Sequence, residues 1–468
     1  MKTFLKMFII SLILLHFFSN NSNAQSTKAQ IEELKQQVLE IQRQNQQQIE
    51  MLQKKIESME ADRASDELKI EEYIAKREAE DSDAWWKKLK AGYKKGLFFE
   101  SMDGNYKMKL TLRGQVQFAL INRDDEETGV DTTNTSFDIR RARIKFNGNA
   151  FRPWFLYTMQ LAADSADVQL RDLYFDAAYN PQIVPRVGQW KIPFNREELN
   201  SSSALQFVAR SILTAEFGMG RSTGAAVGGA IANHLTYSAG LFTGCGRNNR
   251  NCDGSSSNIM YAGRVQFGWG GNLKYSGGSY QSGGDYKLVP NFGKTSSPII
   301  VIGAGLWGQK MDIGAGRFPD GLVDNRIKDI GMDEAFVNEF AIDFNLKNNF
   351  FNIEAGYLGR WIDPEGSINE EIAGTSSSVY DQGFRVQGGV FVVPRTVEIV
   401  GRFAWFELDE AGEDNRDSVW QITPGVNYYI SHDHRWKIQL SYSYIQRKFL
   451  DKDNTVNNNF LAQLQAYF

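Results

Sequence analysis

The sequence has few cysteines, histidines and prolines. In 468 residues there are two cysteines, four histidines and ten prolines. Two cysteines are too few for a disulfide scaffold or a structural zinc site. The histidines form no HExxH pattern, and His432 and His434 flank Asp433 in what reads as a solvated turn. No Walker-type or dinucleotide-binding glycine motif is present. We therefore expect no metal, no cofactor and no catalytic residue.

A charge excess of one sign is also missing. Lys and Arg total 52 and Asp and Glu total 56, so the net charge of −4 indicates no nucleic-acid partner. A hydrophobic content of 42% is too high for a disordered chain. Mean hydropathy is −0.41, and no window after residue 24 reaches 18 apolar residues, which argues against a membrane-spanning helix. What is abundant is glycine, at 42 residues, and aromatic side chains, at 13%. This composition favours many strands separated by turns.

The first 24 residues read as a secretory signal peptide. Lys2 and Lys6 supply the positive start, residues 7–18 form an apolar core, and Ser22 and Ala24 are the small residues of a cleavage site. An apolar core of about 12 residues is too short to span roughly 30 Å of hydrocarbon. The pattern predicts export.

A heptad-like segment follows and predicts a periplasmic coiled coil over residues 25–60. Apolar residues recur at alternating spacings of three and four, which form one stripe along a helix. We call this stripe the seam; it consists of Ile31, Leu34, Val38, Ile41, Ile49, Leu52, Ile56 and Met59. Asn45 marks a stutter in it. A solvated single helix is the alternative. Residues 61–105 are highly charged and read as a linker.

From residue 106 the hydrophobic period changes to two, which is typical of strands. Ala142, Ile144 and Phe146 alternate with Arg141, Arg143 and Lys145, for example. Sixteen candidate strands begin near residues 106, 136, 153, 168, 183, 222, 234, 257, 297, 334, 349, 380, 395, 417, 433 and 457. An even strand number and alternating short and long connections predict a sixteen-stranded antiparallel transmembrane β-barrel over residues 106–468. Residues 271–295 are long where a short turn is due, either as an insertion or as a missed hairpin.

Two stretches resemble the phosphate-selective porin O and P family: RRARIKFNGNAF, from Arg140 to Phe151, and GQWKIPFNREELNSSSALQFVARS, from Gly188 to Ser211. The resemblance implies a homotrimer of sixteen-stranded barrels in the outer membrane of a Gram-negative bacterium. It further implies a third loop that folds into each pore, wall arginines and lysines that guide small anions, and a terminal Phe468 read by the barrel assembly machinery. Because the seam alone favours two strands, the barrels would have to set the number at three.

Basic residues predominate on the polar faces of the predicted strands, where they would line the pore. Eleven cations stand against four acids, Glu339, Asp343, Glu354 and Glu398. Such a lumen attracts anions, although rim residues could equally reach outward to lipid headgroups. The predicted pore-lining cations are Lys107, Lys109, Arg113, Arg141, Arg143, Lys145, Arg264, Arg360, Arg385, Arg402 and Lys437.

The third loop is expected to form the constriction, with Arg196, Glu197, Glu198 and Arg210. The resemblance puts Glu198 where phosphate-selective members carry a lysine. A carboxylate there would repel phosphate unless a cation pairs with it, and the candidates are Arg196, Arg171 and Arg210. The sequence therefore predicts modest anion preference without a tight phosphate site.

Cys245 and Cys252 lie in a predicted external loop with six residues between them. Export to an oxidising compartment predicts that they form a disulfide, with two free thiols as the alternative. For the whole protein, the leading hypothesis is a passive anion-preferring porin in contact with outer-membrane lipid. The alternatives are a general diffusion porin or a structural spacer whose coiled coil reaches toward the cell wall. An enzyme is disfavoured because His234, His432 and His434 all lie near turns.

Overall fold

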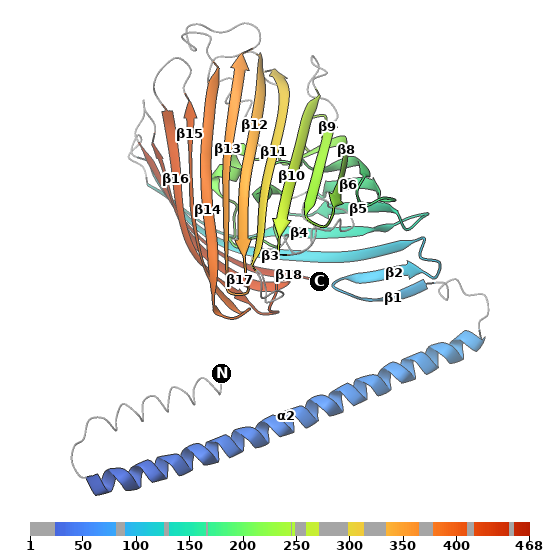
Figure 1. The fold of residues 1–468 in the computed structure, drawn as a ribbon, viewed down its shortest axis with the longest axis vertical. Helices are drawn as coiled ribbons and strands as arrows, with labels where there is room; N and C mark the ends of the chain where they lie inside the picture. Colours follow the sequence, from blue (N-terminus) through green and yellow to red (C-terminus); the bar gives the residue numbers. More distant parts are fainter. Residues whose placement is uncertain are drawn as a thin grey trace. The chain divides into compact units, whose positions relative to one another are not determined.

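The computed structural model describes residues 24–80, 89–125, 131–164, 167–244, 246–248, 259–270, 298–312, 334–364, 378–409, 416–448 and 454–468. The predicted signal peptide, except for Ala24, and both cysteines lie outside these residues. The chain divides into two compact units, Met1–Lys87 and Lys88–Phe468. The first contains one helix and the second contains every strand of the described chain (Figure 1).

The helix α2 runs over Ala24–Glu80. It continues through the first part of the expected linker, because the segment has no glycine or proline and its charges pair along the helix. Arg63 lies 3.4 Å from Glu67, and Lys69 lies 3.5 Å from Asp66. Seam residues Val38, Leu52 and Met59 are all exposed, so association of α2 with other copies stays a prediction. Within the described chain, no helix has both the length and the apolarity to cross a membrane.

The rest of the expected linker contains a β-hairpin. Strands β1 (Leu89–Tyr93) and β2 (Leu97–Ser101) pair antiparallel, and β2 then pairs with the start of β3, from Lys107 to Leu110. Apolar residues alternate in each of these two short strands, which favours the hairpin. The pattern is difficult to recognise in the sequence because lysines surround it.

In the described residues, sixteen strands form a closed antiparallel barrel, which confirms the predicted architecture. Each strand pairs with the next, and β18 closes the ring by pairing with β3. Every strand begins within four residues of its predicted start. The strands are β3 (Lys107–Asp125), β4 (Thr132–Asn149), β5 (Phe155–Ala162), β6 (Gln169–Ala177), β7 (Val184–Lys191), β8 (Arg221–Ile231), β9 (Leu235–Phe242), β10 (Met260–Trp269), β11 (Ile299–Asp312), β12 (Glu334–Lys347), β13 (Phe351–Pro364), β14 (Val379–Val393), β15 (Val397–Asp409), β16 (Arg416–Tyr429), β17 (Trp436–Lys448) and β18 (Thr455–Tyr467).

Strands β10 and β11 pair directly with each other. Trp269 pairs with Ile300 and the pairing continues in register to Tyr261 and Gly308. A further hairpin of the wall would have to separate these two strands, and none lies between them in the described residues. Residues 271–295 themselves lie outside the described residues.

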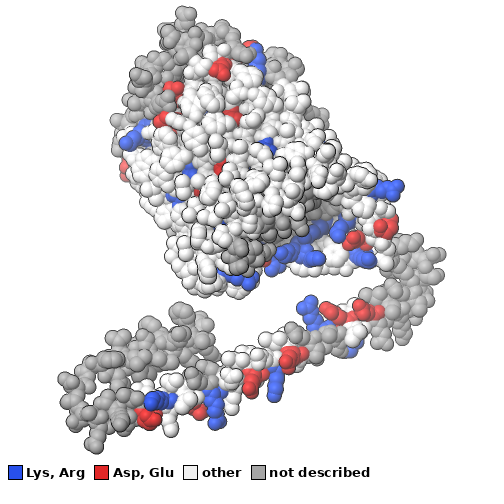
Figure 2. Space-filling model, in the orientation of Figure 1, with Lys and Arg blue, Asp and Glu red and all other residues white. Residues whose placement is uncertain are grey.

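The two faces of the wall differ as the alternation predicts. The outer face exposes apolar side chains such as Ile342, Ile399 and Leu440, and most of the barrel flank carries no charge (Figure 2). The inner face carries buried polar side chains. They are buried because residues 192–220, between β7 and β8, pack inside the barrel. We call this segment the inward loop; it contains α3 (Arg196–Leu199) and α4 (Ile212–Phe217).

Candidate ion pathway inside the barrel

Wall residues on β3, β10, β15, β17 and β18 donate hydrogen bonds to backbone carbonyls of the inward loop. Arg264 Nη1 on β10 donates to Phe194 O at 2.6 Å, and Arg402 Nη1 on β15 donates to Ala209 O at 3.0 Å. On β18, Gln465 Nε2 donates to Ser203 O at 3.0 Å. These bonds attach the loop to much of the circumference, which agrees with a third loop folded into the barrel.

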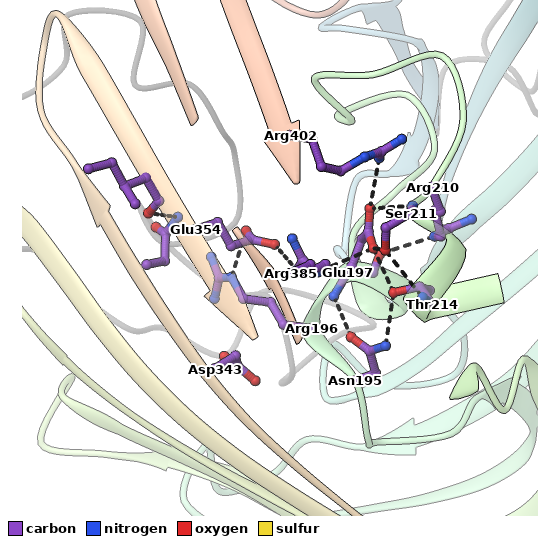
Figure 3. Close-up of polar contacts among 12 residues, drawn as sticks. Asn195, Arg196, Glu197, Arg210, Ser211, Thr214, Asp343, Glu354, Arg385 and Arg402 are labelled. Carbon is purple, nitrogen blue, oxygen red and sulfur yellow. Dashed lines mark hydrogen bonds and ion pairs between the residues drawn. The ribbon is translucent and has the colours of Figure 1, made fainter. Parts of the chain in front are cut away.

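Glu197 is the centre of the loop's attachment (Figure 3). Its carboxylate accepts hydrogen bonds from Ser211 Oγ and Thr214 Oγ1, both at 2.6 Å. It also lies 3.2 Å from Arg385 Nε and 3.5 Å from Arg402 Nη1. Burial raises the pKa of Glu197, but the two guanidinium groups and the two hydroxyls outweigh this effect and lower the pKa to about 2. The residue is therefore a buried anion at neutral pH.

A second carboxylate extends this network. Glu354 on β13 pairs with Arg385 and with Arg196 of α3, whose Nε is 3.1 Å away. Further round the wall, Arg264 pairs with Asp343 at 2.7 Å. The network thus joins the loop to β10, β12, β13, β14 and β15 through charges that neutralise one another.

Arg360 on β13 holds the other helix of the inward loop. Its guanidinium lies 2.8 Å from Asp381, 3.4 Å from Glu339 and 3.0 Å from Glu216 of α4. It also stacks over Phe217, with 4.7 Å between the guanidinium carbon and the ring centre. Arg360 is fully buried by these contacts.

Glu398 on β15 binds the loop through hydrogen bonds from neutral side chains. Its carboxylate accepts hydrogen bonds from Gln206 Nε2 of the loop at 2.7 Å and from Asn352, Asn427 and Tyr429 of the wall at 2.6 to 3.1 Å. Nearby, Lys437 Nζ donates to Leu205 O at 2.7 Å. Glu398 and Lys437 thus both bind the inward loop to the wall.

Five of the predicted pore-lining cations therefore point inward but are covered by the loop. Each is at most 5% exposed and is bonded to the loop or to a buried acid, and the four predicted acids are covered in the same way. The alternation predicts which side of the wall a residue faces, whereas the path of the loop determines whether an ion can reach it. These five are Arg264, Arg360, Arg385, Arg402 and Lys437.

Partly exposed charges gather at the opposite part of the wall, on β3, β4, β6, β7 and β8, together with Arg210 of the inward loop. Side chains of Arg143, Arg171, Arg210 and Arg221 are 11–19% exposed, and Lys145 and Lys191 are also partly exposed. We call the whole group the basic arc. It comprises Arg113, Arg141, Arg143, Lys145, Arg171, Lys191, Arg210 and Arg221, of which Arg113 and Arg141 are buried. Among the described residues, three acids pair with it: Asp164, Asp172 and Glu198.

Two serines of the inward loop, Ser201 and Ser202, face the basic arc. Arg113 and Arg143 lie directly opposite each other on β3 and β4. Arg113 Nη1 donates to Ser202 Oγ at 3.1 Å and to Ser201 Oγ at 3.3 Å, and Arg143 Nη1 lies 3.4 Å from Ser202 Oγ. Two guanidinium groups and several hydroxyls thus meet at one point, a combination of donors that suits an oxyanion.

Glu198 pairs with Arg210, one of its three expected partners, across 3.2 Å. Arg196 contacts Glu354 and Arg171 contacts Asp164 instead. Burial raises the pKa of Glu198, and the nearby Arg210 and Lys191 lower it to below its ordinary value. The predicted mixed-charge site therefore forms with Arg210.

Lys107 and Lys109 lie at the end of the barrel. They belong to the part of β3 that pairs with β2, whereas the pairing of β3 with β18 begins at Arg113. Lys107 Nζ contacts Glu100 at 3.1 Å. These two predicted pore-lining lysines therefore lie at the mouth of the barrel and not within the closed ring of strands.

Sequence reasoning missed Arg171, Asp172, Lys191 and Arg221 as wall charges. The register of β5 against β6 shifts between Gln160 and Leu161, which interrupts strict alternation there. The one available signal was the density of arginines and aspartates in these short strands.

Comparison with known proteins finds a family and several similar folds. The model of the family described as phosphate-selective porin O and P matches residues 109–284. This range contains both motifs on which the resemblance rests, so the match confirms the resemblance. No curated protein matches the sequence. A loop-deletion mutant of OmpT, an outer membrane protein of Vibrio cholerae, is 13% identical, with 77% of this chain and 99% of that chain covered and a TM-score of 0.50. That likeness concerns the fold alone.

Two further solved structures are similar at lower TM-scores. The anion-selective porin from Comamonas acidovorans is 11% identical, with 76% of this chain and 99% of that chain covered and a TM-score of 0.48. The outer membrane channel DcaP of Acinetobacter baumannii is 12% identical, with 79% and 99% covered and the same TM-score.

Proposed function

Because residues 109–284 carry the sequence pattern of the phosphate-selective porin O and P family, we propose that the protein is a passive, anion-preferring porin of the outer membrane. Family and fold both favour a channel over an enzyme. The observation that carries the anion preference is the basic arc, in which six of the eight cations are partly exposed, whereas Arg264, Arg360, Arg385, Arg402 and Lys437 are covered.

The anion preference depends on the balance of charge within the basic arc. The basic arc contains eight cations and contacts three acids, an excess of five (8 − 3). On the covered side, arginines and carboxylates are buried in mutual contact and contribute little field to the lumen. A narrow lumen with one accessible sign concentrates ions of the other sign. Anions such as chloride, phosphate and small organic acids would pass along the partly exposed side chains of the basic arc.

Selectivity for phosphate itself is expected to be modest. The Glu198–Arg210 pair puts a carboxylate beside the arc, and a carboxylate weakens a site for a multiply charged anion. We expect chloride and phosphate to pass comparably. Strong block of chloride current by micromolar phosphate would mean that a phosphate site exists elsewhere on the wall.

Assembly belongs to the same proposal. The signal peptide would direct export of the chain, the barrel assembly machinery would read Phe468, and α2 would associate in the periplasm in a homotrimer. Exposure of the seam supports self-association, because apolar residues at this spacing are buried in a helical bundle. A structural spacer is the second candidate, and it would produce no stepwise conductance.

Replacing the trio Arg141, Arg143 and Lys145 by Gln tests the function. The excess of five falls to two (5 − 3), so the reversal potential in a salt gradient should shift toward cations. Arg395→Gln, an exposed residue in the β14–β15 turn, is the control and should leave it unchanged. An unshifted potential in the triple variant would mean that the arc is off the ion path, as expected for a general diffusion porin.

A further inference from the structure

The barrel is closed by two strands that are far apart in the sequence. Strand β18 pairs with β3 from Thr455 opposite Asp125 to Tyr467 opposite Arg113. Every other neighbouring pair in the described ring joins strands that are consecutive along the chain. We call the pairing of β18 with β3 the closing junction. Because no turn or loop joins these two strands directly, their separation is opposed by the contacts made across the junction.

Two glutamines link the closing junction to the inward loop. Gln115 on β3 and Gln465 on β18 lie directly opposite each other, and both are fully buried. Gln115 Nε2 donates to Gln465 Oε1 at 2.5 Å and to Ser202 O at 3.3 Å. Gln465 Nε2 donates to Ser203 O at 3.0 Å. Two successive carbonyls of the loop thus bind the two strands that close the ring.

Serine hydroxyls give the loop a second attachment to β3. Arg113 Nη1 donates to Ser202 Oγ at 3.1 Å and to Ser201 Oγ at 3.3 Å. The arginine lies in the closing junction, opposite Tyr467, and its side chain is buried. Hydrogen bonds from a buried charged group are among the stronger ones, and their loss leaves part of the cost of burial uncompensated.

These contacts make the inward loop and the closing junction depend on each other. Residues 201–203 contact β3 and β18 at the same time, so the strands separate only if bonds to the loop break. Conversely, Gln115 and Gln465 lose hydrogen-bond acceptors inside the barrel when the loop leaves the wall. Such coupling is reciprocal, because the docked loop stabilises the closed ring by the same free energy by which the closed ring stabilises the docked loop.

We propose that the inward loop is a clamp for the closing junction, in which residues 201–203 hold β3 and β18 together from the lumen. The segment that narrows the pore then also keeps the wall closed. This role is independent of which solutes the channel passes.

Hydrogen exchange of the full-length protein in detergent micelles, read by mass spectrometry, tests the clamp. The double variant Ser201→Ala, Ser202→Ala changes the loop and leaves every residue of the wall in place. We expect exchange in peptides from β3 and β18 to become about tenfold faster or more, because opening of the junction costs less. Peptides from β12 and β13 should exchange as in the wild type.

The matched control removes two lumenal hydroxyls that bond to each other. Thr423 on β16 and Ser443 on β17 lie directly opposite, with 2.9 Å between their side-chain oxygens. The double variant Thr423→Val, Ser443→Ala should leave exchange at the closing junction unchanged.

A disulfide across the closing junction tests the reverse effect with an unaltered loop. Leu112 and Phe468 exchange both backbone hydrogen bonds. Counting in steps of one pair from there, Ala119 and Leu461 form a non-hydrogen-bonded pair, in which the side chains are closer. We expect oxidation of Ala119→Cys, Leu461→Cys to slow exchange in residues 192–220 relative to the reduced form.

The comparison disulfide joins β16 to β17 through Thr423→Cys, Ser443→Cys. Both disulfides are made in a Cys245→Ser, Cys252→Ser background. The second one should leave exchange of the inward loop unchanged, because it locks two strands that the chain already connects.

Three results would overturn the proposal. Unchanged exchange of β3 and β18 in the serine variant would show that the loop only lies against the junction. A uniform increase over all strands would show that the loop stabilises the barrel as a whole. Equal slowing of the loop by both disulfides would contradict a specific coupling to β3 and β18, and this comparison decides the matter if the serine variant does not fold.

Discussion

Replacing Glu197 by Gln should loosen the inward loop and alter the pore. The substitution keeps the shape of the side chain but removes the charge that Arg385 and Arg402 face. A pKa lowered from 4.5 to about 2 corresponds to roughly 3 kcal/mol of stabilisation of the attached loop. Loss of one partner from a buried ion pair costs about 3–5 kcal/mol, which is consistent with that figure.

Single-channel recording in a planar bilayer measures the effect. We expect the Glu197→Gln channel to show larger and noisier conductance, because a loop weakened by about 3 kcal/mol samples detached positions more than a hundredfold more often. Glu334→Gln is the control. Its partner Lys310 lies 2.7 Å away in a half-exposed pair, which contributes at most about 1 kcal/mol.

The noise of the wild-type channel should depend on pH in one direction. Because the folded pKa of Glu197 is lowered, its stabilisation is complete above the ordinary value of 4.5 and is lost as the pH falls toward about 2. Wild-type noise should therefore stay low from pH 7 to pH 5 and rise only in stronger acid. Quiet, unchanged conductance of the Gln variant at neutral pH would refute the role assigned to Glu197.

Three further outcomes are expected. Cys245 and Cys252 should form a disulfide, so thiol labelling of unreduced, denatured protein should detect no free thiol; two labelled cysteines would contradict this. Glu198→Gln should increase anion preference by freeing the charge of Arg210, read from the reversal potential, and an unchanged potential would show that the pair does not face the ion path. The mature protein should run as an SDS-resistant, heat-modifiable trimer. A monomeric mass by light scattering in detergent would contradict the predicted trimer. A predominantly helical circular-dichroism spectrum would contradict the β-barrel.

Alternation in the sequence determined the barrel and the side of the wall on which most residues lie. A period of two holds because neighbouring side chains of a strand point to opposite faces, so strand starts could be located to within four residues. Arg141, Arg143 and Lys145 share the inner face as predicted. A β-bulge opposite Gln115 and Val116 accommodates Arg140 and keeps that pattern in phase.

Tertiary structure decided which inward charges are accessible. Arg385 and Arg143 look alike in sequence, each on the polar face of an alternating strand. One is buried against Glu197 and Glu354, and the other lies partly open beside Asp164. The difference arises because residues 192–220 cross the barrel interior and pack against one part of its wall. Contacts between residues more than a hundred positions apart, such as Arg196 with Glu354, leave no local periodicity from which that path could be predicted.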